Sequence, residues 1–529
     1  MIWHIFKKDW NLLWPLVTGV AGVQVMNTAI WFILRNFGGS QMMAQMSELC
    51  SIAMFLVVGV LVAIAVQQDA VPGDRQDWLV RPIRRRDLML AKLLFILIAV
   101  HGPMLLVDLA LGMAMGFPFW NALSAALSHG VSILVDLSLP VAAVAAMTPT
   151  LVVLFGGLLT VGLVGFLTIL LAGSWYQYHG GLVPTSGIWW MIPTLWSGLA
   201  LLAVVVTVPL QYFRRATIYV RGIVIGAVLL APIAMLLPWT PAFSLQQRLS
   251  ADPAVAKGIG VAFDPRFGKL VMEPGGRNHA NSVWLPLHVS GLVPESIVIN
   301  DRTYVRIISG SGETLYRGPT TGQPHAISDI IDNFPVRTAA GAEVRTHQLV
   351  TLPGKIYDLV RNRPVRMELD YSLTLFRIEA SDKIAALNGN KRMPNIGQCK
   401  TGIDGDGDEV EVLCIETGRI PSCASAVLEN SVSGKRNPPY NVCLPDYSPY
   451  TRPFMRFPMY PFGLDLSFRD PQGLAKYPVD SLQLADAQVA LKAYKPVAHF
   501  TRHLTISEIR PGDWEAEAPA VTTSSSSPK

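Results

Sequence analysis

The stretch LLFILIAVHGPMLLVDLALGMAMGFPFWNALSAALSHGVSILVDLSL, residues 93–139, decides what kind of fold this chain adopts. It contains two acidic side chains, those of Asp108 and Asp136, and no Lys or Arg. An apolar helix of about 20 residues crosses a hydrocarbon core about 30 Å thick. The stretch is long enough for two such crossings, joined by a short turn at GFPFW, residues 116–120. It therefore predicts a pair of antiparallel transmembrane helices.

The rest of the N-terminal half has the same character. The chain has 529 residues, of which 51% are hydrophobic and 15% charged, whereas soluble globular proteins carry about 25% charged residues. From about residue 245 onward the charges return at ordinary density. We therefore expect an α-helical polytopic membrane bundle over residues 1–240, with about seven transmembrane helices. The expected spans are residues 12–34, 49–67, 90–115, 121–147, 149–172, 188–211 and 219–239.

The basic residues of this half predict its orientation. They cluster in short segments beside the apolar spans, whereas a nucleic-acid-binding domain would present them on one folded face. Cytoplasmic loops carry an excess of Lys and Arg, and the clusters all fall on that side if the N-terminus is cytoplasmic. An odd number of spans then makes the C-terminal half extracytoplasmic. We expect a multi-pass protein of the cell (inner) membrane, in contact with lipid and not with nucleic acid. The clusters are Lys7 and Lys8, residues 75–92, and Arg214, Arg215 and Arg221.

The C-terminal half has the pattern of a soluble β-rich domain. In VRMELDYSLTLF, residues 365–376, apolar and polar side chains alternate, which is the period-two signature of a half-buried strand. Several such runs, separated by turn residues, predict a mainly-β domain over residues 283–515, built as a sandwich or as two packed sheets. Residues 241–282 are expected to form an irregular linker. The terminal residues 516–529 are of low complexity, and we expect them to be disordered.

Cysteine spacing offers an independent test of the orientation. Four of the five cysteines lie close together in the C-terminal half, an even number that fits disulfides on an oxidising side of the membrane. Three connectivities are possible. Zinc binding is the weaker alternative, because no CxxC pair occurs. Cys50, at the start of the second span, is expected to be an inert buried thiol. The disulfide candidates are Cys399, Cys414, Cys423 and Cys443.

An acidic segment between two of these cysteines resembles part of a calcium loop. Asp404, Asp406 and Asp408 occupy the first three alternate ligand positions of an EF-hand-like sequence. The sixth position holds Glu409 instead of Gly, and the twelfth holds Ile415 instead of Glu. An acidic turn is the interpretation that we prefer, so we predict no metal site and no cofactor.

Catalytic signatures are missing from the sequence. The Gly-Lys pairs at 268, 354 and 434 are not followed by Ser or Thr, so the chain has no phosphate-binding loop of the GxxxxGK[ST] type. It also has no HExxH and no GxSxG motif. The sequence therefore predicts no ATPase or hydrolase activity in this chain, and it is not expected to be an enzyme.

A basic segment, DWLVRPIRRRDLMLAK at residues 77–92, directly precedes the third expected span. Its apolar side chains can face the membrane while its arginines face the cytosol. The plainest interpretation is a positively charged loop that fixes orientation. The segment also resembles the loop between spans two and three of ABC-2-type transporter permeases, in which an aromatic residue, a short R-P-(apolar)-x-R run and an A-K pair open the third helix. The matching residues are Trp78, Arg81, Pro82, Ile83, Arg85, Ala91 and Lys92.

The resemblance extends over about residues 1–215, since HIFKKDW near the N-terminus is similar to the amphipathic first segment of that family. It implies a permease that pairs with itself or with a second permease and couples to a separate cytoplasmic ABC ATPase. A seventh span and a large outer domain depart from the family plan and put simple small-molecule efflux in doubt. The residues that the resemblance assigns to the ATPase contact are Trp78, Arg81, Pro82, Arg84, Arg85 and Arg86.

A repeat places ionisable groups inside the membrane. Residues 101–111 (HGPMLLVDLAL) and 129–139 (HGVSILVDLSL) are identical at seven of eleven positions. In an antiparallel hairpin, residues at equal depth have a constant index sum. His101 with Asp136 and Asp108 with His129 both give 237, and the turn centre that this implies falls inside GFPFW. We therefore predict two buried His–Asp pairs.

These pairs have three interpretations. Intramembrane charges usually face the bundle interior and mark function, which favours a proton- or substrate-linked polar track. A structural clamp that fixes the register of the hairpin is the alternative that we prefer. Chance similarity between two leucine-rich spans is the third.

The leading functional hypothesis is the permease subunit of an ABC-type transport system, with export as the expected direction and an outer domain that engages substrate or a partner. A membrane-anchored sensor or assembly protein without transport activity is the alternative. A membrane-embedded enzyme that uses the His and Asp residues is a third hypothesis.

Overall fold

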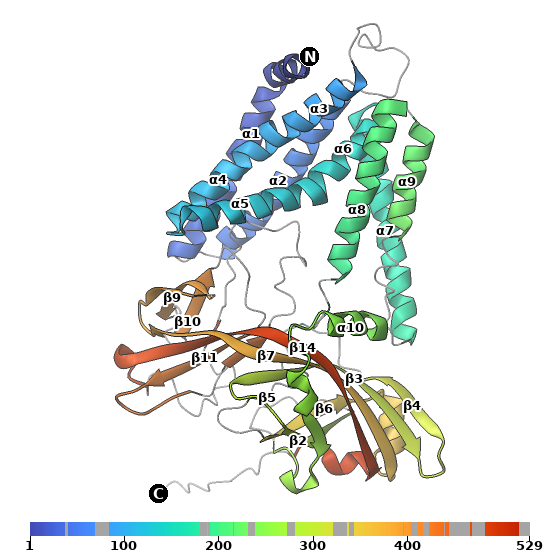
Figure 1. The fold of residues 1–529 in the computed structure, drawn as a ribbon, viewed down its shortest axis with the longest axis vertical. Coiled ribbons are helices and arrows are strands. Elements are labelled where there is room, and N and C mark those ends of the chain that lie inside the picture. Colours follow the sequence, from blue (N-terminus) through green and yellow to red (C-terminus); the bar gives the residue numbers. More distant parts are fainter. Residues whose placement is uncertain are drawn as a thin grey trace, which may run out of the picture.

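The computed structural model describes residues 1–37, 41–68, 84–179, 188, 191–214, 216–230, 239–271, 281–320, 336–337, 343–394, 396–403, 410–415, 423–437, 440–443, 466–467 and 482–517. Helices form the N-terminal half and antiparallel sheets the C-terminal half (Figure 1). The helices of the first half are α1 (Ile2–Phe37), α2 (Gln41–Gln67), α3 (Arg85–Phe95), α4 (Gly102–Ala114), α5 (Phe119–Ile133), α6 (Leu139–Ala146), α7 (Leu151–His179), α8 (Met191–Pro209) and α9 (Thr217–Leu230).

Short π-helical segments interrupt three of these helices. Segment η2 (Ile96–His101) joins α3 to α4, and η3 (Leu134–Ser138) joins α5 to α6, so each pair runs on as one long helix. A third segment, η4 (Leu210–Arg214), continues α8. Each π turn takes one residue more than an α turn, so it rotates the helix face that follows. This rotation changes which intramembrane side chains can meet.

The membrane assignment of this half is confirmed in its coarse form. Among the described residues, five helical stretches are long and apolar enough to cross a bilayer, and two shorter apolar helices, Leu151–Leu167 and Thr217–Ala227, accompany them. The number of seven spans stays a prediction. The five long stretches are Ile2–Ile30, Leu49–Gln67, Arg85–Ala114, Phe119–Ala146 and Thr194–Arg214.

The packing of the bundle fits a lipid environment. Large apolar side chains such as Leu106 and Val205 are 66% and 60% exposed, which is expected where the surrounding solvent is hydrocarbon. The interior between α1, α2, α3 and α6 is rich in alanine, including Ala63, Ala91 and Ala145. Small residues let membrane helices approach closely, since burial of apolar surface gives no advantage over lipid.

One long antiparallel sheet organises the C-terminal half. Among the described residues it has seven strands in the order β12-β11-β14-β7-β3-β4, with β5 also paired to β3. Strands β7 and β14 pair along almost their whole length and form its spine. The strands are β3 (Ser296–Ser309), β4 (Thr314–Pro319), β5 (Val336–Arg337), β7 (Val365–Ala385), β11 (Cys423–Asn430), β12 (Tyr440–Cys443) and β14 (Ala487–Ile509).

Two shorter sheets share hydrophobic cores with this long sheet. The sheet β1-β2-β6 packs on β3, β7 and β14 around Leu285, Leu369 and Tyr371. The sheet β13-β10-β9-β8 packs on the other end of β7 and β14, with β11, around Val412, Leu428 and Leu491. The mainly-β prediction is therefore confirmed. The strands are β1 (Gly260–Phe263), β2 (Ser282–Ser290), β6 (Glu343–Thr351), β8 (Asn390–Met393), β9 (Gly397–Ile403), β10 (Val410–Ile415) and β13 (Leu466–Ser467).

Two segments differ from the sequence-based expectations. Residues 241–282, expected to be an irregular linker, include most of helix α10 (Trp239–Arg248) and all of strand β1. Neither has a strong local signal, because β1 is four residues long and α10 gains its stability from the sheet beneath it. At the C-terminus, Glu517 bridges Val271, and residues 518–529 lie outside the described residues.

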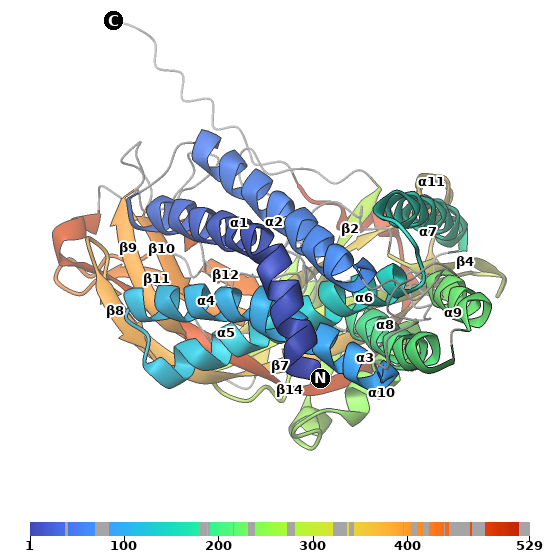
Figure 2. The same cartoon turned by 90° about the horizontal axis from the view of Figure 1, so that it is seen from above.

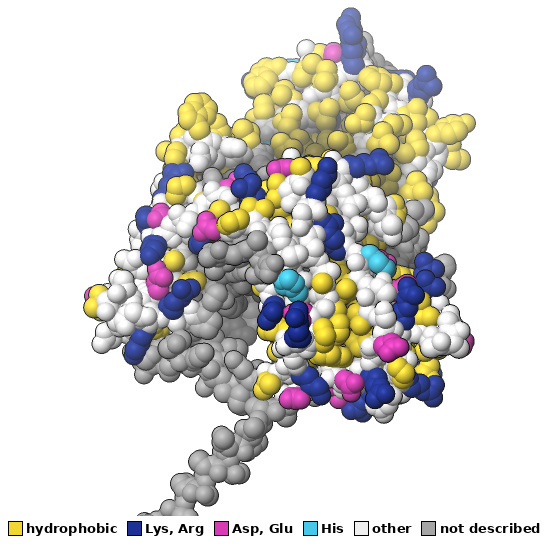
Figure 3. Space-filling view, turned by 60° about the horizontal axis from the view of Figure 1, so that its bottom comes forward, with side chains coloured by type: hydrophobic (Ala, Val, Ile, Leu, Met, Phe, Trp, Pro, Cys, Tyr) yellow, Lys and Arg dark blue, Asp and Glu magenta, His cyan; other side chains and the backbone are white. Residues whose placement is uncertain are grey.

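The two halves meet at one end of the bundle. The N-terminus and the start of α3 lie at the far end, whereas the α4–α5 turn and α10 lie next to the sheets (Figure 1). Viewed from the bundle, α4 and α5 lie above the β8–β11 region, and α7 to α9 lie above the β4 region (Figure 2). Figure 3 shows apolar side chains dominating the bundle surface, with acidic and basic side chains spread over the β half.

Candidate functional site

The predicted pair of Asp108 and His129 is present in the structure. Oδ2 of Asp108, on α4, lies 2.7 Å from Nδ1 of His129, on α5. Oδ1 of Asp108 accepts a hydrogen bond of 3.1 Å from Nε2 of Gln24, on α1. All three residues are buried: Asp108 is 1% exposed, and His129 and Gln24 are each 3% exposed. One buried carboxyl group thus joins three helices.

The second predicted pair has other partners. Nε2 of His101 lies 3.0 Å from Oγ of Ser138, and Oδ1 of Asp136 accepts a hydrogen bond of 2.8 Å from Oγ of Ser197, on α8. The equal-depth argument assumed uninterrupted α-helices. Both residues belong to π-helical segments, η2 and η3, and the extra residue in each π turn changes depth and direction. His101 therefore meets a residue two positions beyond Asp136.

Sequence reasoning missed the part that α1 plays. Gln24 and Asn27 are buried in the middle of an apolar helix, and Asn27 donates a 3.3 Å hydrogen bond to Ser51 on α2. Polar side chains inside a membrane helix usually bond to a neighbouring helix. Their position in the first apolar span was the available signal, but it did not identify Asp108 as the partner of Gln24.

The basic segment before α3 is described only in part. Trp78, Arg81 and Pro82 lie outside the described residues. Arg84, Arg85 and Arg86 are exposed at the start of α3. Nη1 of Arg85 donates a 2.6 Å hydrogen bond to the carbonyl oxygen of Phe213, in η4. The start of α3 is therefore fastened to the end of α8.

A buried ion pair fastens the same region to α1. Nζ of Lys92 lies 2.8 Å from Oδ2 of Asp9, and their side chains are 3% and 0% exposed. Phe6 packs its ring on Phe95 with a centroid distance of 5.9 Å. The HIFKKDW segment and the A-K pair, noted separately in the sequence, thus meet at one end of the bundle. Loss of one partner from a buried ion pair leaves an uncompensated charge, so this contact fixes the position of α3.

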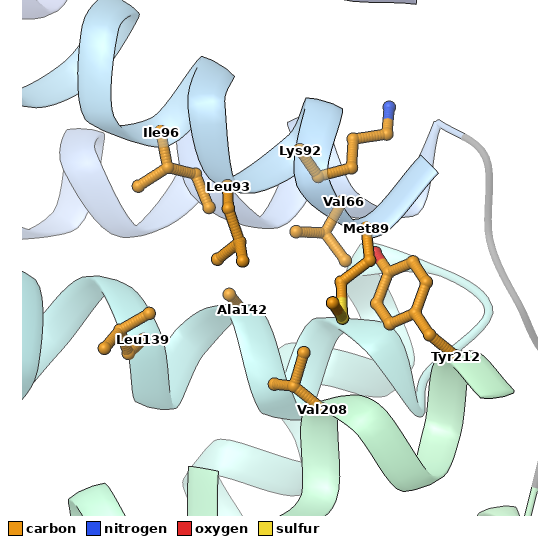
Figure 4. A pocket seen from close by; sticks show the side chains of 9 residues that line it. All are labelled: Val66, Met89, Lys92, Leu93, Ile96, Leu139, Ala142, Val208 and Tyr212. Carbon is orange, nitrogen blue, oxygen red and sulfur yellow. The ribbon is translucent and has the colours of Figure 1, made fainter. Parts of the chain in front are cut away.

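A small cavity lies behind this contact (Figure 4). Its volume of about 20 Å³ is room for about one water molecule. The ammonium group of Lys92 points away from it, and most of the wall is apolar. A cavity of this size and lining does not accommodate a transported solute. It is lined by Val66, Met89, Lys92, Leu93, Ile96, Leu139, Ala142, Val208 and Tyr212.

The disulfide prediction is confirmed. Cys399 and Cys414 are bonded, with an S–S distance of 2.04 Å, across the β9–β10 pair. Cys423 is also disulfide-bonded, and the residue opposite it in the backbone register of β11 and β12 is Cys443. Cys50 is a free, half-buried thiol. The bonds fit an oxidising compartment.

The acidic segment that resembles a calcium loop falls between strands β9 and β10 in the sequence. Asp404, Asp406 and Asp408 lie outside the described residues. Among the residues that the structure does describe, no group of three or more His, Cys, Asp or Glu side chains is placed to hold a metal ion.

Helix α10 sits on the long sheet through a polar contact network that the sequence did not predict. Nε2 of Gln246 lies 3.2 Å from Nε2 of His499, and Nδ1 of His499 lies 2.8 Å from Oγ1 of Thr374. Thr374 in turn donates a 2.5 Å hydrogen bond to Oδ2 of Asp301. Asp301 occupies a bulge in β3, where the pairing with β7 shifts register. The chain of contacts links α10, β14, β7 and β3.

Burial controls the ionisation of this network. It raises the pKa of Asp301 to about 7, although the hydrogen bond from Thr374 opposes the shift. It lowers the pKa of His499 to about 4. A neutral His499 can donate from Nδ1 to Thr374 and accept at Nε2 from Gln246, which satisfies the chain in one direction.

Aromatic side chains also hold α10 on the long sheet. Trp239 stacks on Phe243 at 5.4 Å, and its indole N–H donates a 3.0 Å hydrogen bond to Ser372. Arg302 lies over the Trp239 ring at 5.3 Å. On the bundle side, Ala242 packs with Ile188 and Met191, next to the start of α8. Helix α10 therefore contacts both halves.

A second contact between the halves involves the α4–α5 turn. The guanidinium group of Arg392, on β8, lies 5.9 Å from the ring centroid of Phe117, which belongs to the GFPFW turn. The hairpin that holds Asp108 and His129 thus touches the β half directly.

Comparison with known proteins does not assign a family. The sequence matches no protein-family model, and a comparison with curated proteins gives no match either.

Proposed function

We propose that this chain is the permease subunit of an ABC-type transport system and acts with a separate cytoplasmic ATPase. The observation that carries the proposal is the construction of the basic end of the bundle. There the arginines at the start of α3 are exposed, while the helix behind them is held by Lys92–Asp9 and by Arg85–Phe213. A docking segment needs this combination, because force applied to a loosely held segment would not reach the bundle.

The separation of the two ends supports the same proposal. The exposed arginines lie at the end of the bundle far from the sheets (Figure 1). The disulfides lie in the β half. If the arginine end is cytoplasmic and the β domain is extracytoplasmic, the basic residues lie on the side where membrane proteins concentrate them, and the disulfides lie on the oxidising side. In this arrangement α7 and α9 complete seven crossings, and the permease pairs with a second copy or a paralogue.

The test is co-purification of an ATPase with tagged, full-length protein from its native cells. Changing Arg84, Arg85 and Arg86 together to Glu should reduce the recovered P-loop ATPase about tenfold or more. The reason is that three attractive charges become repulsive ones across a polar contact. Reversal of Arg363, Arg436 and Arg510, which are exposed in the β half, is the matched control and should leave recovery unchanged.

Orientation must be checked in the same experiment, since reversed charges can invert a membrane protein. A reporter that is active only outside the cytoplasm, fused after Glu517, should stay active in both variants. Equal ATPase recovery from a correctly inserted triple variant would contradict the docking role. It would favour the alternative of a membrane-anchored sensor or assembly protein.

A further inference from the structure

Gln24, Asp108 and His129 form an enclosed polar site within the bundle. The two oxygens of Asp108 have separate partners, Nε2 of Gln24 at 3.1 Å and Nδ1 of His129 at 2.7 Å. With at most 3% of any of these residues exposed, the site is shielded from both lipid and solvent. An ionisable group in such a place is expensive, and it marks function more often than not.

The site is not fully satisfied by its own contacts. Nε2 of His129 and Oε1 of Gln24 are buried without a hydrogen-bond partner among the described residues. A buried polar atom without a partner costs about 1–3 kcal/mol. If this contact served only to fix the register of the hairpin, the bundle would be more stable with partners for Nε2 of His129 and Oε1 of Gln24, or with apolar side chains in their place. The unpaired imidazole nitrogen instead gives the site a free position for a proton.

We propose that Asp108 and His129, oriented by Gln24, form an intramembrane proton-binding site. In the deprotonated state, neutral His129 donates its Nδ1 hydrogen to the Asp108 carboxylate, and the pair carries one negative charge. Uptake of one proton forms an N–H bond at Nε2 of His129 and leaves the pair without net charge. Release reverses the step, and no electrons are transferred. This inference is independent of the proposed transport function.

The surroundings allow a titration to be assigned to this pair. Helices α4 and α5 carry no ionisable side chain besides Asp108 and His129. From α1, the group that faces the pair is the uncharged amide of Gln24. The neighbouring π segments contribute His101 and Asp136, each of which has its own serine partner. His101 is also close enough to His129 to interact with it electrostatically. Asp136 therefore serves as a matched intramembrane carboxyl control.

The experiment is an infrared pH titration of full-length protein in lipid nanodiscs between pH 5 and 9. Carboxyl and imidazole bands of the wild type should change together in one transition. That transition should be lost in D108N and kept in D136N. In H129Q the imidazole change should be lost, because the nitrogen that takes up the proton is gone. Any remaining carboxyl transition of Asp108 should have its midpoint about one pH unit or more from that of the wild type, because an imidazolium 2.7 Å away is replaced by a neutral amide.

Two results would overturn the proposal. The first is that the wild type shows no transition that is changed by D108N or by H129Q. The second is that D136N abolishes the transition as completely as D108N does. If D108N does not fold, the midpoint of the transition in Q24L provides the test. It removes one hydrogen bond to the carboxylate, so it should move the midpoint if the site titrates, whereas an unchanged midpoint would count against the site.

Discussion

At the scale of single residues, Asp108 determines how the α4–α5 hairpin is joined to α1. Because its carboxyl group contacts both Gln24 and His129, removal of either partner leaves a buried polar group. In soluble proteins, breaking a buried charge pair costs about 3–5 kcal/mol. Contacts between membrane helices often measure nearer 1 kcal/mol, since the unfolded chain in the membrane also finds partners.

The first prediction is that Asp108 and His129 are energetically coupled. D108A and H129A should each destabilise the bundle. Together they should destabilise it by about 1 kcal/mol less than the sum of the two, as measured by unfolding in mixed detergent micelles. H101A and D136A should be additive to within about 0.5 kcal/mol, because these residues have different partners. Additive effects of D108A and H129A, together with coupled effects of H101A and D136A, would contradict the contacts described above.

The second prediction concerns Asp301 and His499. Folded Asp301 holds its proton up to a pKa of about 7, against 3.8 ordinarily, so it lowers stability as pH rises through this interval. Folded His499 has a pKa of about 4, against 6.5 ordinarily, so it lowers stability as pH falls from 6.5 to 4. In the wild type the two slopes nearly cancel between pH 4 and 6.5.

Single substitutions should therefore reveal opposite slopes. D301N should become more stable as pH rises from 4 to 6.5, and H499Q should become less stable as pH rises from 4 to 7. Each slope should approach about 1.4 kcal/mol per pH unit. Thermal unfolding of the purified proteins across this range gives the measurement. Parallel pH profiles for the wild type and both variants would show that these groups do not titrate as described.

At the scale of elements, α10 is the helix that connects the two halves. Phe243 is 2% exposed against the sheet, whereas Leu245, two residues along, is 45% exposed. The third prediction is that F243A loosens α10 and L245A does not. A buried Phe→Ala change costs about 3–5 kcal/mol, so amide hydrogen exchange in α10 should accelerate about a hundredfold or more. Equal exchange in the two variants would mean that Phe243 does not hold the helix.

The sequence predicted helices and strands well wherever the pattern of apolar and polar residues was determined by a single environment, either lipid or water. Apolar spans of about 20 residues identified the helical half, and the alternation in β7 identified the sheet half. From Tyr371 the alternation in burial stops, because α10 covers Ser372 and Thr374 on the second face. A covering helix is a tertiary contact, and local sequence does not encode it. For the same reason neither α10 nor β1 was expected.

The candidate sites show a similar division. The index sum located the Asp108–His129 contact, because the residues between this pair and the turn are α-helical. It misplaced His101 and Asp136, because the π segments lie in or next to these positions. Disulfides were predictable from cysteine number and compartment alone. The Asp301 network was not, because it depends on a bulge in β3 and on strands far apart in the sequence.

At the scale of the whole molecule, the contacts between the halves constrain the path of the chain. The start of α8 packs near α10 through Met191 and Ala242, and the α4–α5 turn reaches β8 through Phe117 and Arg392. Both points lie at the end of the bundle next to the sheets. The connection between α6 and α7 lies toward the opposite end, where Arg221 donates a 3.5 Å hydrogen bond to the carbonyl oxygen of Met147. An odd number of crossings, five or seven, gives the same side for the β half.

The fourth prediction is that cysteine labelling will find two sets of positions. In a C50S background, cysteines introduced at Trp120 and Val432, which are 74% and 77% exposed, should react with a membrane-impermeant maleimide on intact cells stripped of any outer envelope. Cysteines at Lys7 and Pro149, also exposed, should react only after permeabilisation. The disulfide-bonded cysteines remain unreactive unless reduced, so they give no background.

A cysteine at Thr194, which is exposed near the start of α8, distinguishes the possible span counts. Position 149 follows four crossings in either case, so it should match Lys7 whether or not α7 crosses the membrane. If α7 crosses, Thr194 lies on the outer side and should be labelled on intact cells, as Trp120 is. If α7 instead stayed on one side, α8 would begin on the cytoplasmic side, away from α10. Labelling at 194 only after permeabilisation would therefore contradict seven crossings, whereas loss of external labelling at Val432 would contradict the extracytoplasmic position of the β half.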